Sequence, residues 1–305
     1  MMLWPKQSIG WCLAIAVAVG GLLTIEPTRA SETAKPSKPT IQIGMIGSLF
    51  RDVPDSLVDL MAKPFGTLMA TQTGMNGNLV KTGDARDLGR RLMDQQVHVG
   101  IFHGFEFAWA RQVYPDLRPL CIAVNQEKHL RALLVVKADS DVGGFADLKE
   151  KKLNFPKGSR GHCHLFLETC CQECGQCSPQ EYLSQVVASG NAEDALDEVV
   201  DGEAAAVLID GIALDCYKRR KPGRCNQLKV AVESPIFPAG VVAYRKDSLD
   251  DATLKRFKDG LVGAHKTILG KQLLTMWKLT GFEAVPDDYD QILENIAKVY
   301  PLPAE

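Results

Sequence analysis

Short apolar and β-branched runs alternate with longer helical segments along most of this 305-residue chain. Such runs predict strands, which we place at residues 41–46, 78–81, 97–102, 120–124, 132–137, 152–155, 186–188, 205–209, 228–232 and 237–245. Helices are expected between them, at residues 55–73, 84–95, 105–113, 145–149, from about 160, at 191–201, 212–218, 249–269 and 271–279; residues 179–185 begin a further element, and residues 288–299 form the last one. This alternation predicts an α/β fold with mainly parallel sheets flanked by helices.

The first thirty residues have the layout of a secretory signal peptide. Lys6 precedes an apolar run at 11–23, and Thr28 and Ala30 are small residues before an expected cleavage after Ala30. An uncleaved anchor is the alternative, but the run is short for a membrane span. Residues 31–40, rich in Ser, Lys, Pro and Thr, predict a flexible linker. We therefore expect an exported protein, periplasmic or secreted.

Two apolar strands, at 132–136 and 240–244, bracket the middle third of the chain. If both cross between two lobes, residues 41–131 and 237–305 form lobe 1 and residues 132–236 form lobe 2. A ligand would then bind in the hinge cleft, at the carboxyl ends of the strands. The formal net charge of −2 offers no basic face for a nucleic acid, so no such partner is expected.

The segment 152–177 carries the clearest candidate for a binding site. It reads as a strand, a Pro-Lys-Gly-Ser turn and a helix that begins near Arg160. Ser159 is a candidate N-cap, and the start of a helix offers unpaired backbone N–H groups to a small anion. Arg160, Gly161 and His162 would complete this site. Ordinary capping of a surface helix is the alternative.

Other candidate ligand residues follow the predicted strands. Ser48 and Phe50 come after the first strand, His103 and Glu106 after the third, and Asp210 after the strand at 205–209. Turn chemistry and packing, or an ion pair between the lobes, would explain the same residues. As ligand residues, Glu106 and Asp210 opposite Arg160 would suit a zwitterion, or a ligand with both phosphate-like and amine groups.

Several segments in a fixed order resemble one known family. They are IGMIGS, VHVGIFHGFEFAWA, ALLVVKADSDVGGFADLKEKKLNFPKGSRG, AAVLIDG and ESPIFPAGVVAYRKD. The chain resembles the periplasmic substrate-binding proteins of phosphate-, phosphite- and phosphonate-type ABC importers, across essentially all of the expected mature chain. The resemblance implies a two-lobed, type II periplasmic-binding-protein fold. It also implies closure on a small ligand and delivery to a permease in the inner membrane.

The resemblance also implies roles for particular residues. Ser159 keeps the first position of the family's Ser-Thr-Ser-Gly run, whereas Arg160 and Gly161 replace the next two. Phe107 stands where the family has an aromatic hydroxyl, and the family's histidine falls near Ala192. Asp210 matches the acidic residue after the strand of the second lobe. The Arg160 guanidinium can bind an oxyanion in a bidentate way, and would replace some of the hydrogen-bond donors that the family has at these positions and this chain lacks.

Eight cysteines follow the expected signal peptide, and their even number in an oxidising compartment predicts disulfides. Cys216 and Cys225 flank a basic loop and form one candidate pair; Cys121, in an apolar strand, is expected to be a buried thiol. Within the cluster at 163–177, Cys171 and Cys177 are candidates for a local bridge. Zinc binding and unpaired thiols are the alternatives for the cluster, which comprises Cys163, Cys170, Cys171, Cys174 and Cys177.

These observations favour a monomeric solute-binding protein for a small anionic or zwitterionic molecule, without a cofactor. An exported metal-binding or redox-sensing protein on the same scaffold is the alternative that the cysteines suggest. A sensory domain with the same lobes is a third reading. No nucleophile elbow, phosphate-binding loop or Ser-His-Asp order is present in the sequence, so we do not expect an enzyme.

Overall fold

The structure is a computed structural model that describes residues 40–51 and 55–303. The predicted signal peptide, 1–30, and all but the last residue of the predicted linker, 31–40, lie outside these residues. Across the described residues, no helix has both the length and the apolar character needed to cross a membrane.

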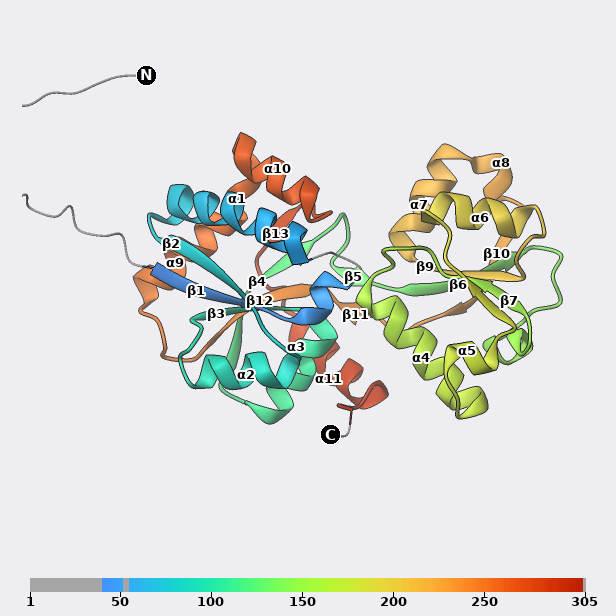
Figure 1. Ribbon diagram of the computed structural model, residues 1–305, viewed down its shortest axis with the longest axis horizontal. Coiled ribbons are helices and arrows are strands. Elements are labelled where there is room, and N and C mark those ends of the chain that lie inside the picture. The colour runs from blue at the N-terminus through green and yellow to red at the C-terminus, as the bar shows by residue number, and fades with distance from the viewer. Residues whose placement is uncertain (1–39, 52–54, 304–305) are drawn as a thin grey trace, which may run out of the picture. The chain divides into compact units, whose positions relative to one another are not determined.

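Two sheets organise the described part of the chain (Figure 1). The first has the order β13-β4-β12-β3-β1-β2, and the second has the order β10-β6-β9-β7-β8. The strands of the first sheet are β1 (Thr40–Met45), β2 (Asn76–Lys81), β3 (Val99–Phe102), β4 (Leu117–Val124), β12 (Gly240–Arg245) and β13 (Gly281–Glu283). Those of the second are β6 (Ala132–Lys137), β7 (Lys152–Asn154), β8 (Gln185–Val187), β9 (Ala206–Asp210) and β10 (Leu228–Glu233). Between them, the short strands β5 (His129–Leu130) and β11 (Phe237–Pro238) pair with each other.

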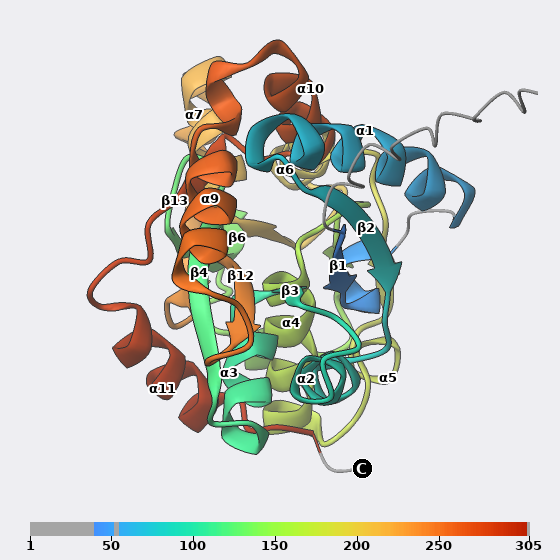
Figure 2. The same cartoon turned by 90° about the vertical axis from the view of Figure 1, so that its left-hand side faces the viewer.

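Helices cover both faces of each sheet, which confirms the predicted α/β class (Figures 1 and 2). On the first sheet, one face carries α1 (Asp55–Thr73), α9 (Asp251–Val262) and α10 (Ile268–Met276), and the other carries α2 (Ala85–Met93), α3 (Gly104–Val113) and α11 (Tyr289–Val299). On the second sheet, one face carries α6 (Ala192–Val200), α7 (Gly211–Arg220) and α8 (Pro222–Cys225), and the other carries α4 (Gly161–Gly175) and α5 (Pro179–Tyr182). The 3₁₀ turns are η1 (Gly47–Phe50), η2 (Phe145–Leu148) and η3 (Ala264–Lys266).

Strand β6 shows why these sheets need helices on both faces. Its first five residues are buried, and alternate side chains join different apolar clusters. Leu133 and Val135 pack with residues of α6 and α7, whereas Leu134 and Val136 join the cluster that includes residues of α4. Successive side chains of a strand point to opposite faces, so a strand that is apolar throughout is stable only between two layers.

The prediction of mainly parallel sheets is wrong, because both sheets are mixed. The β1–β2, β1–β3, β7–β8 and β7–β9 pairs are parallel, and the other pairs in the two sheets are antiparallel. A parallel neighbour needs a crossover connection, usually a helix. Strand β12 instead enters the first sheet directly from β11, and runs antiparallel to both β3 and β4.

Two predicted boundaries also differ from the structure. The strand predicted at 237–245 is divided at Ala239 into β11, which pairs with β5, and β12, which joins the first sheet. The helix predicted at 249–269 is interrupted after Val262, where η3 separates α9 from α10. At Ala239 the apolar pattern continues through the break, so periodicity gave no signal of it. After Val262 the signal is local: Thr267 is the N-cap of α10, and its side chain accepts a hydrogen bond from the Gly270 N–H.

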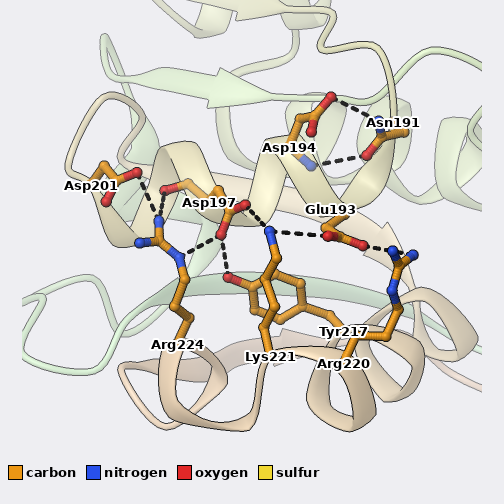
Figure 3. Close-up of polar contacts among 9 residues, drawn as sticks. All are labelled: Asn191, Glu193, Asp194, Asp197, Asp201, Tyr217, Arg220, Lys221 and Arg224. Carbon is orange, nitrogen blue, oxygen red and sulfur yellow. Dashed lines mark hydrogen bonds and ion pairs between the residues drawn. The ribbon is translucent and has the colours of Figure 1, made fainter.

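A network of ion pairs joins α6 to the basic segment that ends α7 and begins α8 (Figure 3). Asp197 accepts hydrogen bonds from Tyr217 Oη at 2.7 Å, Lys221 Nζ at 2.5 Å and Arg224 Nε at 2.5 Å. Glu193 extends the network to Arg220 and Lys221. One half-buried carboxylate thus holds three side chains that the chain places 20 to 27 residues away.

Asp197→Asn is expected to lower the free energy of unfolding by about 1–2 kcal/mol, because it removes a charged acceptor shared by three donors in a partly screened position. Urea unfolding measures the change. Asp194→Asn is the matched control on the same helix: Asp194 is exposed, and its carboxylate bonds the Asn191 side chain (Figure 3). We expect a change within about 0.5 kcal/mol there. Equal decreases in the free energy of unfolding of the two variants would show that the ion-pair network around Asp197 does not contribute to stability.

Candidate functional site

Four strand ends supply the polar side chains of the candidate site. From the first sheet, β1 leads into η1, which contains Ser48, and β3 leads into α3, where His103 is the N-cap. From the second sheet, β7 leads through a turn into α4, with Arg160 as its N-cap, and β9 ends at Asp210, the N-cap of α7. The carboxyl ends of strands are where open α/β sheets bind ligands.

His103 connects the two groups of residues. A Cβ atom placed on Gly161 would lie 3.0 Å from His103 Nε2, so the imidazole rests against the start of α4. This close approach explains why glycine occupies position 161. The His103 ring also stacks on Phe105 at 5.5 Å between centroids. A side chain from α3 therefore contacts the helix that the sequence predicted as the anion site.

Burial lowers the pKa of His103 to about 4, and the charges of His162, Arg51 and Arg160 act in the same direction. A hydrogen bond with the Ser48 backbone opposes the shift. Such a bond raises the pKa of an imidazole when the ring is the donor, so the backbone acceptor is the carbonyl. His103 Nε2 is buried without a hydrogen-bond partner among the described residues. At neutral pH, the ring is therefore uncharged and presents a lone pair at Nε2.

Glu106 lies in the first turn of α3, three residues after the N-cap His103, and is buried. The Ser48 hydroxyl donates a hydrogen bond of 2.7 Å to its Oε2 atom. Burial raises the pKa of Glu106 to about 7, although the Ser48 bond and the charge of Arg51 both act to lower the pKa. Ser48 thus contacts both residues, through its hydroxyl to Glu106 and through its backbone to His103, and Glu106 titrates near neutral pH.

The start of α4 is uncapped by side chains. Arg160 is its N-cap, with φ −71° and ψ 154°, and no side chain caps the helix. The prediction of Ser159 as N-cap is wrong: its hydroxyl donates to the Pro156 carbonyl at 2.7 Å and closes the preceding turn. The first bonds within the helix run from the N–H groups of Cys163 and His164 to the Arg160 carbonyl. The N–H groups of Gly161 and His162 therefore point out of the helix end.

Asp210 faces this helix end from β9. Its Oδ2 atom lies 3.6 Å from Arg160 Nε and 3.2 Å from His162 Nε2, while Oδ1 accepts a bond of 2.8 Å from the Ile212 N–H. Burial alone would raise the pKa of Asp210, but the His162 ring, Arg160 and the Ile212 N–H together hold it below its usual value. Asp210 is therefore ionised at neutral pH.

Three atoms in this region are buried without a well-formed hydrogen bond: His103 Nε2, His162 Nε2 and Asp210 Oδ2. The last two are within 3.2 Å of each other, but the contact lacks hydrogen-bond geometry. His162 is only 3 % exposed, with its ring against Phe237. Buried polar atoms normally have partners, so this set is suited to a ligand that both donates and accepts hydrogen bonds.

Two predicted ligand residues lie elsewhere. Phe107 is fully buried and packs against Phe102 at 5.6 Å, within the core between α3 and the sheet. Phe50 is half-buried and packs against a different apolar cluster, one that includes β1 residues. Sequence reasoning missed Arg51, whose charge acts on both His103 and Glu106. Its position directly after Phe50, beyond the first strand, was the available signal.

The cysteines give no support to the metal alternative. No group of three or more His, Cys, Asp or Glu side chains among the described residues is placed to hold a metal ion. All eight described cysteines are free thiols, so neither Cys216 and Cys225 nor Cys171 and Cys177 are bridged in this structure. Cys121 is a buried thiol as predicted, and burial raises its pKa to about 12.

A surface hollow of about 440 Å³ lies apart from the candidate site, on the second sheet. Its walls include Lys137, Asp139, Ser140, Lys151 and Lys152. It is open, and it contains none of the unpartnered buried atoms described above. We therefore place the candidate site at the start of α4 and not in this hollow.

Residues 52–289 match the family described as ABC transporter, phosphonate, periplasmic substrate-binding protein. No curated protein sequence matches the chain.

Solved structures share the fold at low sequence identity. XAC2383 from Xanthomonas citri, solved with chloride ion, is 16% identical with a TM-score of 0.58, over 86% of this chain and 97% of that one. PhnD1 from Prochlorococcus marinus, in complex with methylphosphonate, is 15% identical with a TM-score of 0.55, over 85% and 97%. A binding protein component of an ABC phosphonate transporter from Pseudomonas aeruginosa is 16% identical with a TM-score of 0.53, over 85% and 86%.

These structures confirm the predicted type II periplasmic-binding-protein fold. The family match over residues 52–289 confirms the family that the sequence motifs suggested. The chain belongs to the periplasmic substrate-binding proteins of phosphonate-type ABC transporters.

Proposed function

We propose that this protein captures a small oxyanion or zwitterion of the phosphate and phosphonate class at the start of α4. The observation that carries the proposal is the convergence of three buried polar atoms beside the Arg160 side chain: His103 Nε2, which has no partner among the described residues, and His162 Nε2 and Asp210 Oδ2, which lie 3.2 Å apart without hydrogen-bond geometry. Arg160 and the N–H groups of Gly161 and His162 would bind the anionic oxygens. Asp210 and His103 Nε2 would accept hydrogen bonds from donors on the ligand.

Binding proteins of ABC importers hold a small ligand and interact with a permease, and membership of the family implies a location outside the cytoplasm. We propose that residues 41–131 and 237–305 act as one lobe and residues 132–236 as the other. The short β5–β11 pair, at the two points where the chain passes between the sheets, supports a hinge there. The signal peptide at 1–30, the linker at 31–40 and the monomeric state belong to the same proposal.

We do not propose a chemical step on the ligand. The buried candidates for acid–base chemistry contact other protein groups: Glu106 accepts from Ser48, and Asp210 caps α7. The alternative of a metal-binding or redox-sensing protein is not favoured, because the geometry of the cysteine cluster provides no metal site within the described residues.

The known ligands of related structures define the first experiment. PhnD1 from Prochlorococcus marinus was solved with methylphosphonate, and XAC2383 was solved with chloride and with ATP. Thermal unfolding of the full protein should be measured with phosphate, phosphite, methylphosphonate and 2-aminoethylphosphonate.

At a hundredfold excess over its dissociation constant, a true ligand stabilises the folded state by about 2.7 kcal/mol, which is roughly 5–10 °C in Tm. Sulfate at the same ionic strength is the control for general anion effects. No Tm increase with any compound beyond that with sulfate would contradict the proposed ligand class.

A further inference from the structure

The far end of α4 contains a second feature, which the binding function does not use. The helix ends at Gly175, and Gln176 adopts the left-handed conformation, with φ 50° and ψ 35°. Its N–H donates to the Gln172 carbonyl at 2.9 Å, and the Gln172 side chain donates to the Cys177 carbonyl at 3.3 Å. The chain therefore turns back sharply at Gln176 and is held close to the helix that it leaves.

This type of helix ending turns Cys177 back toward the last turns of the helix. A contact between the residue after the left-handed one and the helix residue four or five positions before the left-handed one frequently accompanies such an ending. Here the left-handed residue is Gln176, so Cys177 is expected to pack over Gln172 or Cys171. Cys177 is half-buried and packs against the apolar cluster that contains Cys171. Cys171 is completely buried.

Electrostatics and the surrounding space agree with this pairing. Burial raises the pKa of the Cys171 thiol to about 12, and the next contribution comes from Cys177, ahead of Cys174. A Cβ atom on Gly175 would lie 3.0 Å from the Cys177 sulfur and 2.7 Å from the Tyr182 ring. Glycine at 175 therefore leaves the space in which the Cys177 side chain folds back onto the helix.

The other local pairings fit the structure less well. Residues four apart on an intact helix suit a disulfide poorly. The helix continues to Gly175, so Cys170 and Cys174 remain on regular helix. Cys174 is exposed, whereas Cys177 packs against the apolar cluster that contains the buried Cys171. The left-handed conformation of Gln176 places Cys177 outside the regular helix, which is what permits a bridge to Cys171.

We infer that Cys171 and Cys177 form a disulfide that closes the carboxyl end of α4 in the exported protein. The oxidant would be a protein dithiol oxidase that carries a disulfide, as found in oxidising compartments. The Cys177 thiolate attacks that disulfide, displaces one thiolate and forms a mixed disulfide. The Cys171 thiolate then attacks the Cys177 sulfur and releases the second thiolate. Two thiols of this chain are oxidised, and their two protons are balanced by protonation of the two released thiolates, so that the oxidase is reduced to its dithiol.

The sequence provides a sharp test, because Glu173 lies between the two cysteines of the pair. The full protein, exported to the periplasm, is denatured without reductant, alkylated and digested with a protease that cuts after glutamate. Cleavage after Glu168, Glu173 and Glu181 gives peptides 169–173 and 174–181. We expect these two peptides to be linked, with alkyl groups on Cys170 and Cys174 located by fragmentation.

Two variants make the assignment specific. Cys177→Ser should abolish the linked species, whereas Cys174→Ser should retain it. The wild-type peptide map remains decisive if a variant folds poorly. A bridge within peptide 174–181, a link through Cys170 or Cys174, or alkylation of all four cysteines in the wild-type protein would overturn the inference.

Reduction supplies an independent readout. A reductant should lower the Tm of the wild-type protein by about 3–8 °C, since the bridge restricts the unfolded chain. The same treatment should leave the Tm of Cys177→Ser unchanged within about 1 °C. An equal decrease in both proteins would contradict the pairing. Neither result depends on ligand binding, so this inference and the proposed function can fail separately.

Discussion

Arg160→Ala is expected to weaken ligand binding by roughly 10- to 150-fold, the cost of about 1.5–3 kcal/mol for a lost charge-assisted hydrogen bond. Arg160 occupies the N-cap position of α4, but its side chain makes no capping hydrogen bond, and its Nε atom lies 3.6 Å from Asp210 Oδ2. It therefore provides a positive charge beside the N–H groups that begin that helix. Isothermal titration calorimetry with the compound that gives the largest Tm increase measures the change in the dissociation constant.

Two further variants separate the geometry of Arg160 from its charge. Arg160→Lys keeps the charge but loses the planar fork, so its affinity should lie between those of the wild-type protein and Arg160→Ala. Arg256→Ala removes an exposed arginine on α9 and serves as the control for net charge. Its affinity should stay within about twofold of wild type. If Arg160→Ala binds as tightly as Arg256→Ala, the ligand does not contact the start of α4.

Replacement of Glu106 by Gln should change how stability depends on pH. Burial raises the pKa of Glu106 to about 7 from its usual 4.5. Between these two values, the folded protein keeps a proton that the unfolded chain has released, so the free energy of unfolding falls as the pH rises. The stabilisation is complete below about pH 4.5 and lost above about pH 7, and its total size is about 3 kcal/mol.

His103 acts in the opposite direction over much of the same range. Its pKa is lowered to about 4 from 6.5, so between these two pH values the unfolded chain binds a proton that the folded protein does not bind. This effect raises the free energy of unfolding as the pH increases from about 4 to 6.5. The two effects partly cancel in the wild-type protein, which would hide both in a simple pH profile.

The difference between wild type and Glu106→Gln isolates the carboxyl, because His103 is present in both proteins. Urea unfolding at a series of pH values should show the wild type losing about 3 kcal/mol relative to Glu106→Gln between pH 4.5 and 7. Glu294→Gln, an exposed residue on α11, is the control and should show no such trend. A difference that does not vary with pH would mean that Glu106 ionises normally in the folded protein.

Hydrophobic pattern was sufficient to predict the α/β class and most strands, because the central strands are apolar throughout. Strand β6 is the clearest case: its first five residues are buried between helices on both faces. Strand direction could not be predicted in this way. The antiparallel entry of β12 depends on the chain returning through β11, and a short apolar run looks the same in either direction.

The candidate site was predicted in part because strand ends and turn residues mark it in the sequence. His103, Arg160, Gly161, His162 and Asp210 come together as expected. Ser159 shows the limit of local reasoning: a serine before a helix can cap it, but here its hydroxyl bonds the turn carbonyl of Pro156. Phe107 followed from the family resemblance, yet its ring points into the core.

The structural argument for a bridge in the cysteine cluster depends on the backbone conformation of Gln176, which the sequence did not reveal. Gln176 is left-handed although it is not glycine, and it follows Gly175, which an ordinary reading would make the helix-ending residue. Moving the turn by one residue changes which cysteine folds back over the helix. The sequence named Cys171 and Cys177 as candidates among several possibilities, and the turn at Gln176 is the structural argument for that pair.

Native mass spectrometry of the exported protein tests the central claim most directly. The wild-type protein and Arg160→Ala would each be mixed with equal concentrations of phosphate, phosphite, methylphosphonate and 2-aminoethylphosphonate. We predict a one-to-one adduct with the mass of one of these compounds on the wild-type protein, and its loss from Arg160→Ala. A wild-type protein that retains none of them, or an adduct equally abundant on the variant, would contradict an oxyanion site at the start of α4.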